Sequence, residues 1–340
     1  MTIQLSDHFT YKKLLRYVLP SILMMIFTSL YCIVDGFFVS NFVGKSAFAA
    51  INLMMPILMG VSTIGFMLGT GGSAIVSKTL GEKEPENANK YFSMITYAAI
   101  ILGSFLSVVG FAFAEPITRS FGADGELLLN SVIYVRILFV FTPAYMLQVM
   151  FQSFFVVAEK PHYSLRITLF AGIANMILDY VFIVLFNWGI AGAAFATGIG
   201  YCIGAGVPIF YFARKHNSSK LKLCKTRFYG KIFLKTCTNG SSEMVSNLSS
   251  SIVGILYNLQ LMKYAGENAV AAYGILMYAG FIFIAIYIGY SMGSSPIVSF
   301  HQGAKNYTEL KNMFKKGLSL MILGGLLFVT IAEIFARPLV

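Results

Sequence analysis

The chain has 340 residues, of which 57% are hydrophobic and only 11% are charged, and it contains 31 Phe and 31 Gly. A soluble domain carries about 25% charged residues, so this composition excludes a soluble globular protein. The charges cluster between apolar stretches long enough to cross a hydrocarbon core about 30 Å thick. Because these stretches are continuously apolar and do not alternate with polar residues, they predict membrane-spanning helices and exclude barrel strands.

The apolar stretches predict nine spans in chain order. The polar segment before the first span has no signal-peptide cleavage pattern, so the first span is expected to be retained. The fifth and sixth spans are separated only by a short turn around Asn187. The expected spans cover residues 17–40, 52–77, 91–114, 130–156, 164–186, 190–213, 236–262, 270–299 and 316–336.

The net charge of +11 would suggest nucleic acid as a partner if the protein were soluble. Here the basic residues gather in the segments that lie on the same side as the N-terminus, above all in 214–235. The opposite side has Lys45, Arg119, Lys263 and Arg337. This bias follows the positive-inside rule and predicts a cytoplasmic N-terminus in a multi-pass protein of the prokaryotic cytoplasmic membrane. The charge therefore indicates topology, and no nucleic-acid partner is expected.

An internal repeat with a constant offset of 222 residues organises the chain. Its clearest part is a set of matches, in which Gly71, Ser73, Gly81 and Lys83 recur as Gly293, Ser295, Gly303 and Lys305. Since the repeat restarts after an even number of spans, the two halves should share one orientation, as in parallel-repeat transporters. The expected fold is an all-α membrane protein with a complete six-helix N-lobe (1–213), a basic cytoplasmic linker (214–235) and a partial, three-helix C-lobe (236–340). We expect the sequence to be truncated after the ninth span.

Three acidic residues, Asp35, Asp179 and Glu243, fall inside apolar spans. A carboxylate at mid-membrane costs roughly 2.5–3.5 kcal/mol on insertion scales, so it normally faces a cavity and has a function. Tyr31 precedes Asp35 by one helical turn, and Asn175 precedes Asp179 by one turn on the same face. Burial disfavours the charged form of a carboxyl group, which makes the pair candidate proton carriers. Their oxygens could equally ligate Na⁺, and the alternative is a static polar contact between the first and fifth spans.

Two further positions are assigned from the same pattern. Pro20 removes a hydrogen bond from the first span and predicts a bend there. Glu243 is either a second ion site or an interfacial residue near the cytoplasmic end of its span. Gly44-Lys45-Ser46 lacks the first glycine and the preceding strand of a phosphate-binding loop, so ATP is not expected as a direct energy source. The cysteines and histidines lack ligand spacing, and no cofactor is expected.

The chain resembles the MATE (multidrug and toxic compound extrusion) transporter family. The resemblance is carried by Val34 to Val39 with Ala49 and Ala50, by Asn175 to Asp179, and by Gly189 to Thr197. It implies that Asp35 is the carboxylate of the first helix, with Pro20 as its bend. It also implies an N-lobe cation site completed by Asn175 and Asp179 and lined by Tyr31, Gln152 and Thr197. Gln152 stands where relatives often have Asn, and Ser242 replaces the proline usual at the start of the seventh helix.

The resemblance implies a function as well as a fold. It predicts a secondary antiporter, not an enzyme, that exports lipophilic cationic compounds in exchange for H⁺ or Na⁺ by alternating access. Expected partners are these small molecules and membrane lipids, and the protein is expected to be a monomer. Two alternatives remain open. One is a flippase for lipid-linked oligosaccharides or peptidoglycan precursors, which would need a cationic cavity for phosphate; the other is an inactive fragment.

Overall fold

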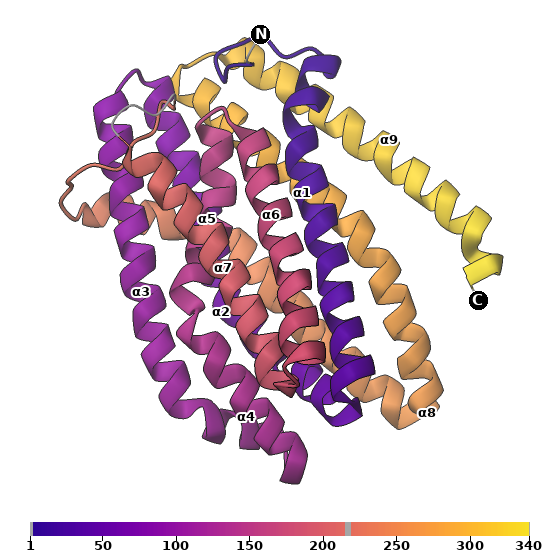
Figure 1. Ribbon diagram of the computed structural model, residues 1–340. Coiled ribbons are helices and arrows are strands. Elements are labelled where there is room, and N and C mark those ends of the chain that lie inside the picture. The colour runs from indigo at the N-terminus through magenta and orange to yellow at the C-terminus, as the bar shows by residue number, and fades with distance from the viewer. Residues whose placement is uncertain (1–2, 215–218, 340) are drawn as a thin grey trace.

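The structure is a computed structural model that describes residues 3–214 and 219–339. Side chains are described throughout these ranges except at 254–255, 258–259, 261–263, 265–279, 281–282, 331–332 and 335–339. Over the described residues the elements are helices, arranged as a bundle with one helix set apart (Figure 1). They are α1 (Tyr11–Phe38), η1 (Val39–Val43), α2 (Lys45–Gly81), α3 (Pro85–Ser120), α4 (Gly125–Val140), α5 (Thr142–Val157), α6 (Pro161–Asp179), η2 (Tyr180–Leu185), α7 (Gly189–Ala213), α8 (Gly230–Gly303) and α9 (Tyr307–Leu339).

The all-helical membrane fold predicted from the sequence is confirmed. Among the described residues, seven helices are long and apolar enough to cross a membrane, or eight if α4 and α5 form one broken span. These two helices meet at an angle of 59°, where the sequence predicts a single span over 130–156. Pro143 lies in the first turn of α5, where its missing N–H is tolerated but a continuing helix would be disrupted. The span is therefore present but broken.

Aromatic side chains form the core of the first bundle. Phe92 on α3 packs against Phe154 on α5 and Phe212 on α7, with ring centroids 4.8 and 5.0 Å apart. All three rings are fully buried. Other phenylalanines on the same helices, such as Phe105 and Phe210, are largely exposed. Since an exposed phenyl ring is unfavourable in water but not in lipid, this distribution places the outer faces of the bundle against hydrocarbon.

Helix α8 reverses direction and forms two legs. A straight helix of its 74 residues would be about 110 Å long. However, Thr236 near the start of α8 contacts Gly71 of α2, and Phe300 near the end of α8 contacts Gly81, which also lies on α2. Figure 1 shows the turn at the end of the bundle away from the N-terminus. The expected spans 236–262 and 270–299 correspond to these two legs. Of the two, the second is found among the candidate spans of the described residues, over Phe283–Gly303.

The contacts between α2 and α8 repeat with the offset of 222 residues. Gly81 packs so closely on Phe300 that an added Cβ would overlap the carbonyl oxygen of Phe300. Gly303 packs in the same way on the carbonyl oxygen of Lys78. Since Gly81 corresponds to Gly303 and Lys78 to Phe300, the two contacts are the same contact made twice around a pseudo-twofold axis. We call this pair of contacts the glycine seam.

The N-terminal segment connects the two halves at the same end of the bundle. The backbone N–H of Leu5 donates to Glu159, which follows α5, over 2.8 Å. The N–H of Phe9 donates to Glu309 on α9 over 3.0 Å. Tyr17 on α1 donates its hydroxyl hydrogen to the carbonyl of Val156, 2.7 Å away. The first residues of the chain therefore link the first bundle to the last helix.

The described part of the basic linker lies along α3 as an ordered strip. The N–H of Lys222 donates to Asn89 (2.8 Å), and that of Cys224 donates to Ser93 (2.9 Å). Helix α8 begins at Gly230, so the last residues of the range 214–235 are helical. The linker is consequently held against the first bundle by backbone hydrogen bonds and by the ion pair between Lys220 and Glu159.

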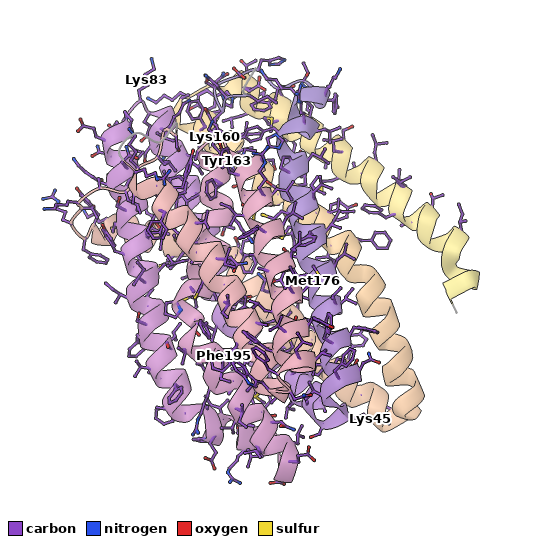
Figure 2. The ribbon with its side chains drawn as sticks, in the orientation of Figure 1. Lys45, Lys83, Lys160, Tyr163, Met176 and Phe195 are labelled. Carbon is purple, nitrogen blue, oxygen red and sulfur yellow. The ribbon has the colours of Figure 1, made fainter. Side chains whose placement is uncertain are left out.

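The two ends of the bundle differ in charge. Figure 2 shows Lys83 and Lys160 at the end that also holds the N-terminus, with Lys45 at the opposite end. We refer to these as the N-terminal end and the far end. The arrangement matches the asymmetry read from the sequence, and the cytoplasmic location of the N-terminal end stays a prediction from that asymmetry.

Candidate ion-coupling site

The candidate site lies where α1 packs against α6. Gly172 on α6 makes this approach possible, because a Cβ there would lie 2.6 Å from the ring of Phe27 on α1 and 3.4 Å from the ring of Tyr31. With this contact fixed, Asp35 on α1 and Asp179 on α6 face each other. Their carboxyl groups are close enough to interact directly with each other.

The acidic pair is short of hydrogen-bond donors. Asp179 is fully buried, and both of its oxygens lack a donor among the described residues; the same holds for the buried Oδ1 of Asp35. Asp35 as a whole is only half-buried. Two ionised carboxylates in such a place would repel each other strongly and remain desolvated. The arrangement is electrostatically more favourable when a proton or a small cation lies between the two carboxyl groups.

Both acids precede a stretch of π-helix. Helix α1 passes into η1 four residues after Asp35, and α6 ends at Asp179, directly before η2. The N–H of Val39 is shared between the carbonyls of Asp35 and Gly36. Since π-helical turns are rare and occur mostly at functional sites, their position next to both acids singles out this region of the two helices.

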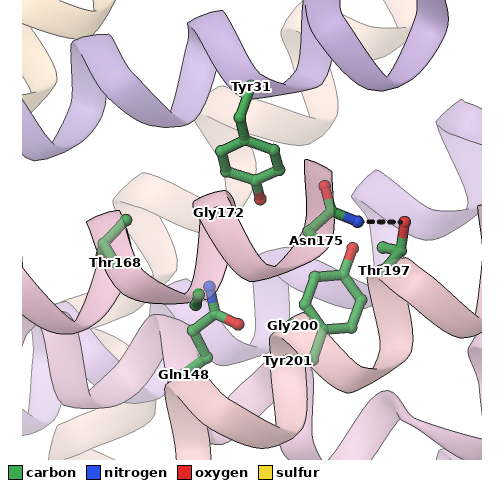
Figure 3. A pocket seen from close by; sticks show the side chains of 9 residues that line it. Tyr31, Gln148, Thr168, Gly172, Asn175, Thr197, Gly200 and Tyr201 are labelled. Atoms are coloured by element: carbon green, nitrogen blue, oxygen red, sulfur yellow. Dashed lines mark hydrogen bonds between the residues drawn. The ribbon is translucent and has the colours of Figure 1, made fainter. Parts of the chain in front are cut away.

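A small cavity lies one helical turn from the pair, and neither acid is among its lining residues. Its polar lining comes from α1, α5, α6 and α7, and Figure 3 shows these side chains pointing toward one another. Asn175 donates its Nδ2 hydrogen to Thr197 over 3.5 Å, while its buried Oδ1 lacks a donor among the described residues. The polar side chains that line the cavity are Tyr31, Gln148, Thr168, Asn175, Thr197 and Tyr201.

The structure brings together most of the residues that the sequence singles out. Tyr31, Asn175 and Thr197 line this one cavity, and the acidic pair lies one helical turn from Tyr31 and Asn175. Gln152, in contrast, lines a neighbouring cavity with Ser164. The two cavities share Gln148, which stands one turn of α5 from Gln152, so the role of Gln152 in the same site as Tyr31 and Thr197 stays a prediction.

The other two sequence candidates lie away from this cavity. Pro20 is buried inside α1, which continues without a break from Tyr11 to Phe38, so its role as a bend remains a prediction. Glu243 is half-buried on the first leg of α8, one turn after Gly240, which packs on Met67 of α2. This places Glu243 near the interface between the two halves, and its role as a second ion site also remains a prediction.

Three lining residues were not anticipated from the sequence: Gln148, Thr168 and Tyr201. The signal for Gln148 was present, since Gln148 and Gln152 stand one turn apart in an otherwise apolar helix. Thr168 and Asn175 also share one face of α6. Tyr201 stacks on Tyr145, with centroids 4.4 Å apart, and nothing in the sequence specifies which of the tyrosines face inward.

The donor atoms of the site suit a proton or a hard cation. Carboxylate and amide oxygens from Asp35, Asp179 and Asn175 are of the type that hard metal ions prefer. Within the described part of the chain, no group of three His, Cys, Asp or Glu side chains is placed to hold a metal ion. A transition-metal centre is accordingly not indicated by these residues.

Comparisons with known proteins agree with this architecture. The family model MatE matches residues 20–181 and 243–340, which is more than half of the chain. The multidrug export protein MepA of Staphylococcus haemolyticus is 26% identical over 326 residues, covering 96% of this chain and 70% of the relative. MepA of Staphylococcus saprophyticus is 26% identical over 306 residues, covering 90% of this chain and 67% of the relative.

Solved structures show the same fold. A crystal structure of MATE in complex with MaL6 superposes with a TM-score of 0.92 at 21% identity, covering 98% of this chain and 74% of that one. An outward-facing conformation of a multidrug resistance MATE transporter gives a TM-score of 0.90 at the same identity and with 98% and 74% coverage. The chain therefore belongs to the MatE family of membrane transporters.

Proposed function

We propose that the protein is an antiporter that exports lipophilic cationic compounds in exchange for H⁺ or Na⁺, with Asp35 and Asp179 as the coupling site. The observation that carries this proposal is the buried acidic pair. Two carboxyl groups that face each other without other donors bind one positive charge far more readily than none. The names of the relatives, both multidrug export proteins, support the class of substrate.

The arrangement suggests how binding at the pair would act on the rest of the protein. Asp35 is on α1 and Asp179 is on α6, so a proton or cation shared between them draws the two helices together. α1 also packs against α8 through Val18 and Gly293. A shift of α1 relative to α6 would therefore be transmitted to the interface between the halves, where alternating access needs a two-state element.

The driving force is sufficient for export. Moving one elementary charge across 100 mV supplies roughly 2.3 kcal/mol, which corresponds to more than a tenfold concentration difference. Binding of an amphipathic cation would use apolar and aromatic surface with few acidic groups. A flippase for phosphate-linked lipids would instead need basic groups around the cavity, and the ionisable side chains found here beside the cavity are acids and tyrosines.

The proposal is tested by ethidium efflux from a drug-sensitive host that expresses the chain with Asp35→Asn or Asp179→Asn. The matched control is Asp124→Asn, an exposed acid at the start of α4. We expect each site variant to lose efflux at least tenfold and the control to retain it. Unchanged efflux in both site variants would refute the assignment. Repeating the assay in proteoliposomes, with either a pH gradient or a Na⁺ gradient alone, identifies the ion.

A further inference from the structure

A stripe of buried polar residues runs along α6 from the acidic pair toward the N-terminal end of the bundle. It consists of Ser164, Thr168, Asn175 and Asp179, which follow one another at helical spacing on one face. Their exposed fractions are 4%, 4%, 3% and 0%. At 1.5 Å per residue the stripe is about 22 Å long, most of the thickness of a hydrocarbon core. Ser164 lies one turn from Pro161, where α6 begins beside Lys160 at the N-terminal end (Figure 2).

Two glutamines on α5 face this stripe. Gln148 and Gln152 stand one turn apart and are 8% and 7% exposed. Gln148 lies tightly against α7, since a Cβ on Gly204 would come within 2.6 Å of its Cδ. Its Oε1 is buried and lacks a donor among the described residues. A buried amide oxygen without a donor costs about 1–3 kcal/mol unless water satisfies it.

Two cavities adjoin the stripe and meet at Gln148. The first holds Asn175 and Thr168, and the second holds Thr168, Ser164 and Gln152; Gln148 lines both. Each leaves a volume of about 10 Å³ for the centre of a water molecule, which is close to the room that one ordered water needs. Each also offers at least three polar side chains, the number of partners that a buried water usually has.

We propose that these cavities hold a short chain of water molecules that carries the coupling proton from Asp179 along α6 to the N-terminal end of the bundle, with Gln148 positioning the water between them. The inference rests on the proposed function, because it takes the acidic pair as the site of the coupling ion. It goes further by choosing H⁺ and by giving it an exit that lies inside the N-lobe.

The transfer is a simple relay. The O–H bond of the protonated carboxyl group breaks as its proton bonds to the first water. That water passes one of its protons to the next, and the last proton enters bulk water, so a carboxylate remains at the pair. Hydroxyl groups of Thr168 and Ser164 and the amides of Gln148 and Gln152 hold the waters in line by hydrogen bonds. No bond other than O–H bonds is made or broken.

The surroundings favour a proton over a sodium ion on this route. Phe151, Phe155 and Ile167 form much of the wall of the second cavity. A Na⁺ ion there would lose most of its hydration shell beside apolar side chains, which is costly. A proton needs only one water at each position. The route starts at Asp179, because Asp179 is fully buried and belongs to the polar stripe on α6, whereas Asp35 is half-buried and lies on α1.

Gln148 and Thr168 mark the junction of the two cavities, because both side chains line both cavities. A proton that passes from one cavity to the other must pass these two side chains. Gln148 is thus a positioning residue at this junction, since rotation of its amide would change which water it contacts.

The test uses infrared spectroscopy of the full chain in liposomes selected for outward exposure of an N-terminal tag. After a rapid rise in external pH, the decay of the protonated carboxyl band measures release toward the N-terminal end. We expect Gln148→Leu and Thr168→Val to slow this decay at least tenfold and Thr168→Ser to restore it. Thr96→Val is the matched control, since Thr96 is equally buried on α3 but donates to the carbonyl of Phe92 within its own helix.

The outcomes separate this inference from the proposed function. If the band persists after Asp35→Asn combined with Asp179→Asn, the pair is not the proton site and the water path is refuted. The proposed function fails only if the same variants also keep ethidium efflux. If the band belongs to the pair but Gln148→Leu and Thr168→Val release protons as fast as Thr96→Val, only the water path is refuted. Should Gln148→Leu fail to fold, Thr168→Val and its serine counterpart decide the question alone.

Discussion

The glycine seam predicts that a single methyl group will push the two halves of the protein apart at the N-terminal end. The change is Gly303→Ala. A Cβ at this position would lie 2.9 Å from the carbonyl carbon of Lys78 and closer still to its oxygen. Ordinary contact begins at 3.4 Å, so the backbones of α2 and α8 must separate by at least about 0.5 Å. Because the obstacle is backbone, no side-chain rotation relieves it.

The expected cost is that of overpacking, about 1–3 kcal/mol. This cost applies only to the conformation described here, in which α2 and α8 are in contact at the glycine seam. The ratio of molecules with the seam closed to molecules with the seam open should therefore drop by about 5-fold to 150-fold. The measurement is the distance between spin labels at Lys83→Cys and Lys305→Cys, two exposed positions just beyond the seam. The native cysteines, Cys32, Cys202, Cys224 and Cys237, are first replaced by serine.

The matched control is Gly60→Ala, in α2, where a Cβ meets nothing within 4 Å. Replacing glycine by alanine inside a helix is otherwise stabilising by roughly 0.5–1 kcal/mol, so the control should keep the short distance and gain thermal stability. Gly81→Ala should behave like Gly303→Ala, because it makes the same contact from the other half. If both seam variants give the distance distribution of Gly60→Ala, the close approach does not limit closure and the reasoning is wrong.

Two smaller predictions concern the N-terminal segment and α1. Tyr17→Phe removes the buried hydrogen bond to Val156 and leaves its carbonyl unpaired, so the midpoint of thermal unfolding should fall by the equivalent of about 1–3 kcal/mol; an unchanged midpoint would contradict this. Burial acts to raise the pKa of Asp7, but hydrogen bonds from Lys13 and from the N–H of Gln4 outweigh it and hold that pKa below its usual 3.8. The stabilisation is therefore present above that usual value and lost as the pH falls through the lowered pKa, so Asp7→Asn should be less stable than the native chain at neutral pH but match it in acid. A deficit in thermal stability that persists unchanged in acid would show that the carboxylate is not responsible.

The sequence predicts those site residues whose polar side chains are energetically costly to place inside a membrane span, together with polar neighbours on the same helix face. Asp35 and Asp179 stand out because a carboxyl group in a membrane span is costly, and Asn175 stands out because it shares the face of Asp179. The repeat offset is likewise visible without coordinates, and it aligns Gly81 with Gly303. In each case the information lies within one helix or in the comparison of two stretches of sequence.

The parts that the sequence does not predict depend on how neighbouring helices are rotated about their axes. Gln148 and Gln152 are both polar and both on α5, and only the packing of α5 against α6 and α7 determines which of them adjoins Asn175. In the same way, nothing in the sequence distinguishes Tyr201 and Tyr145 from the other tyrosines. The break at Pro143 and the strip that Lys222 and Cys224 form along α3 also arise from contacts between segments distant in sequence.

The glycine seam has a consequence for the origin of the fold. Gly81 against Phe300 and Gly303 against Lys78 form an isologous contact, the kind that two copies of one unit make around a twofold axis. A single six-helix unit that carried such a glycine and such a carbonyl could have paired with a second copy of itself before the halves were joined. Joining them in one chain then leaves each position free to change independently, so that one half can acquire side chains such as the acidic pair without a matching change in the other.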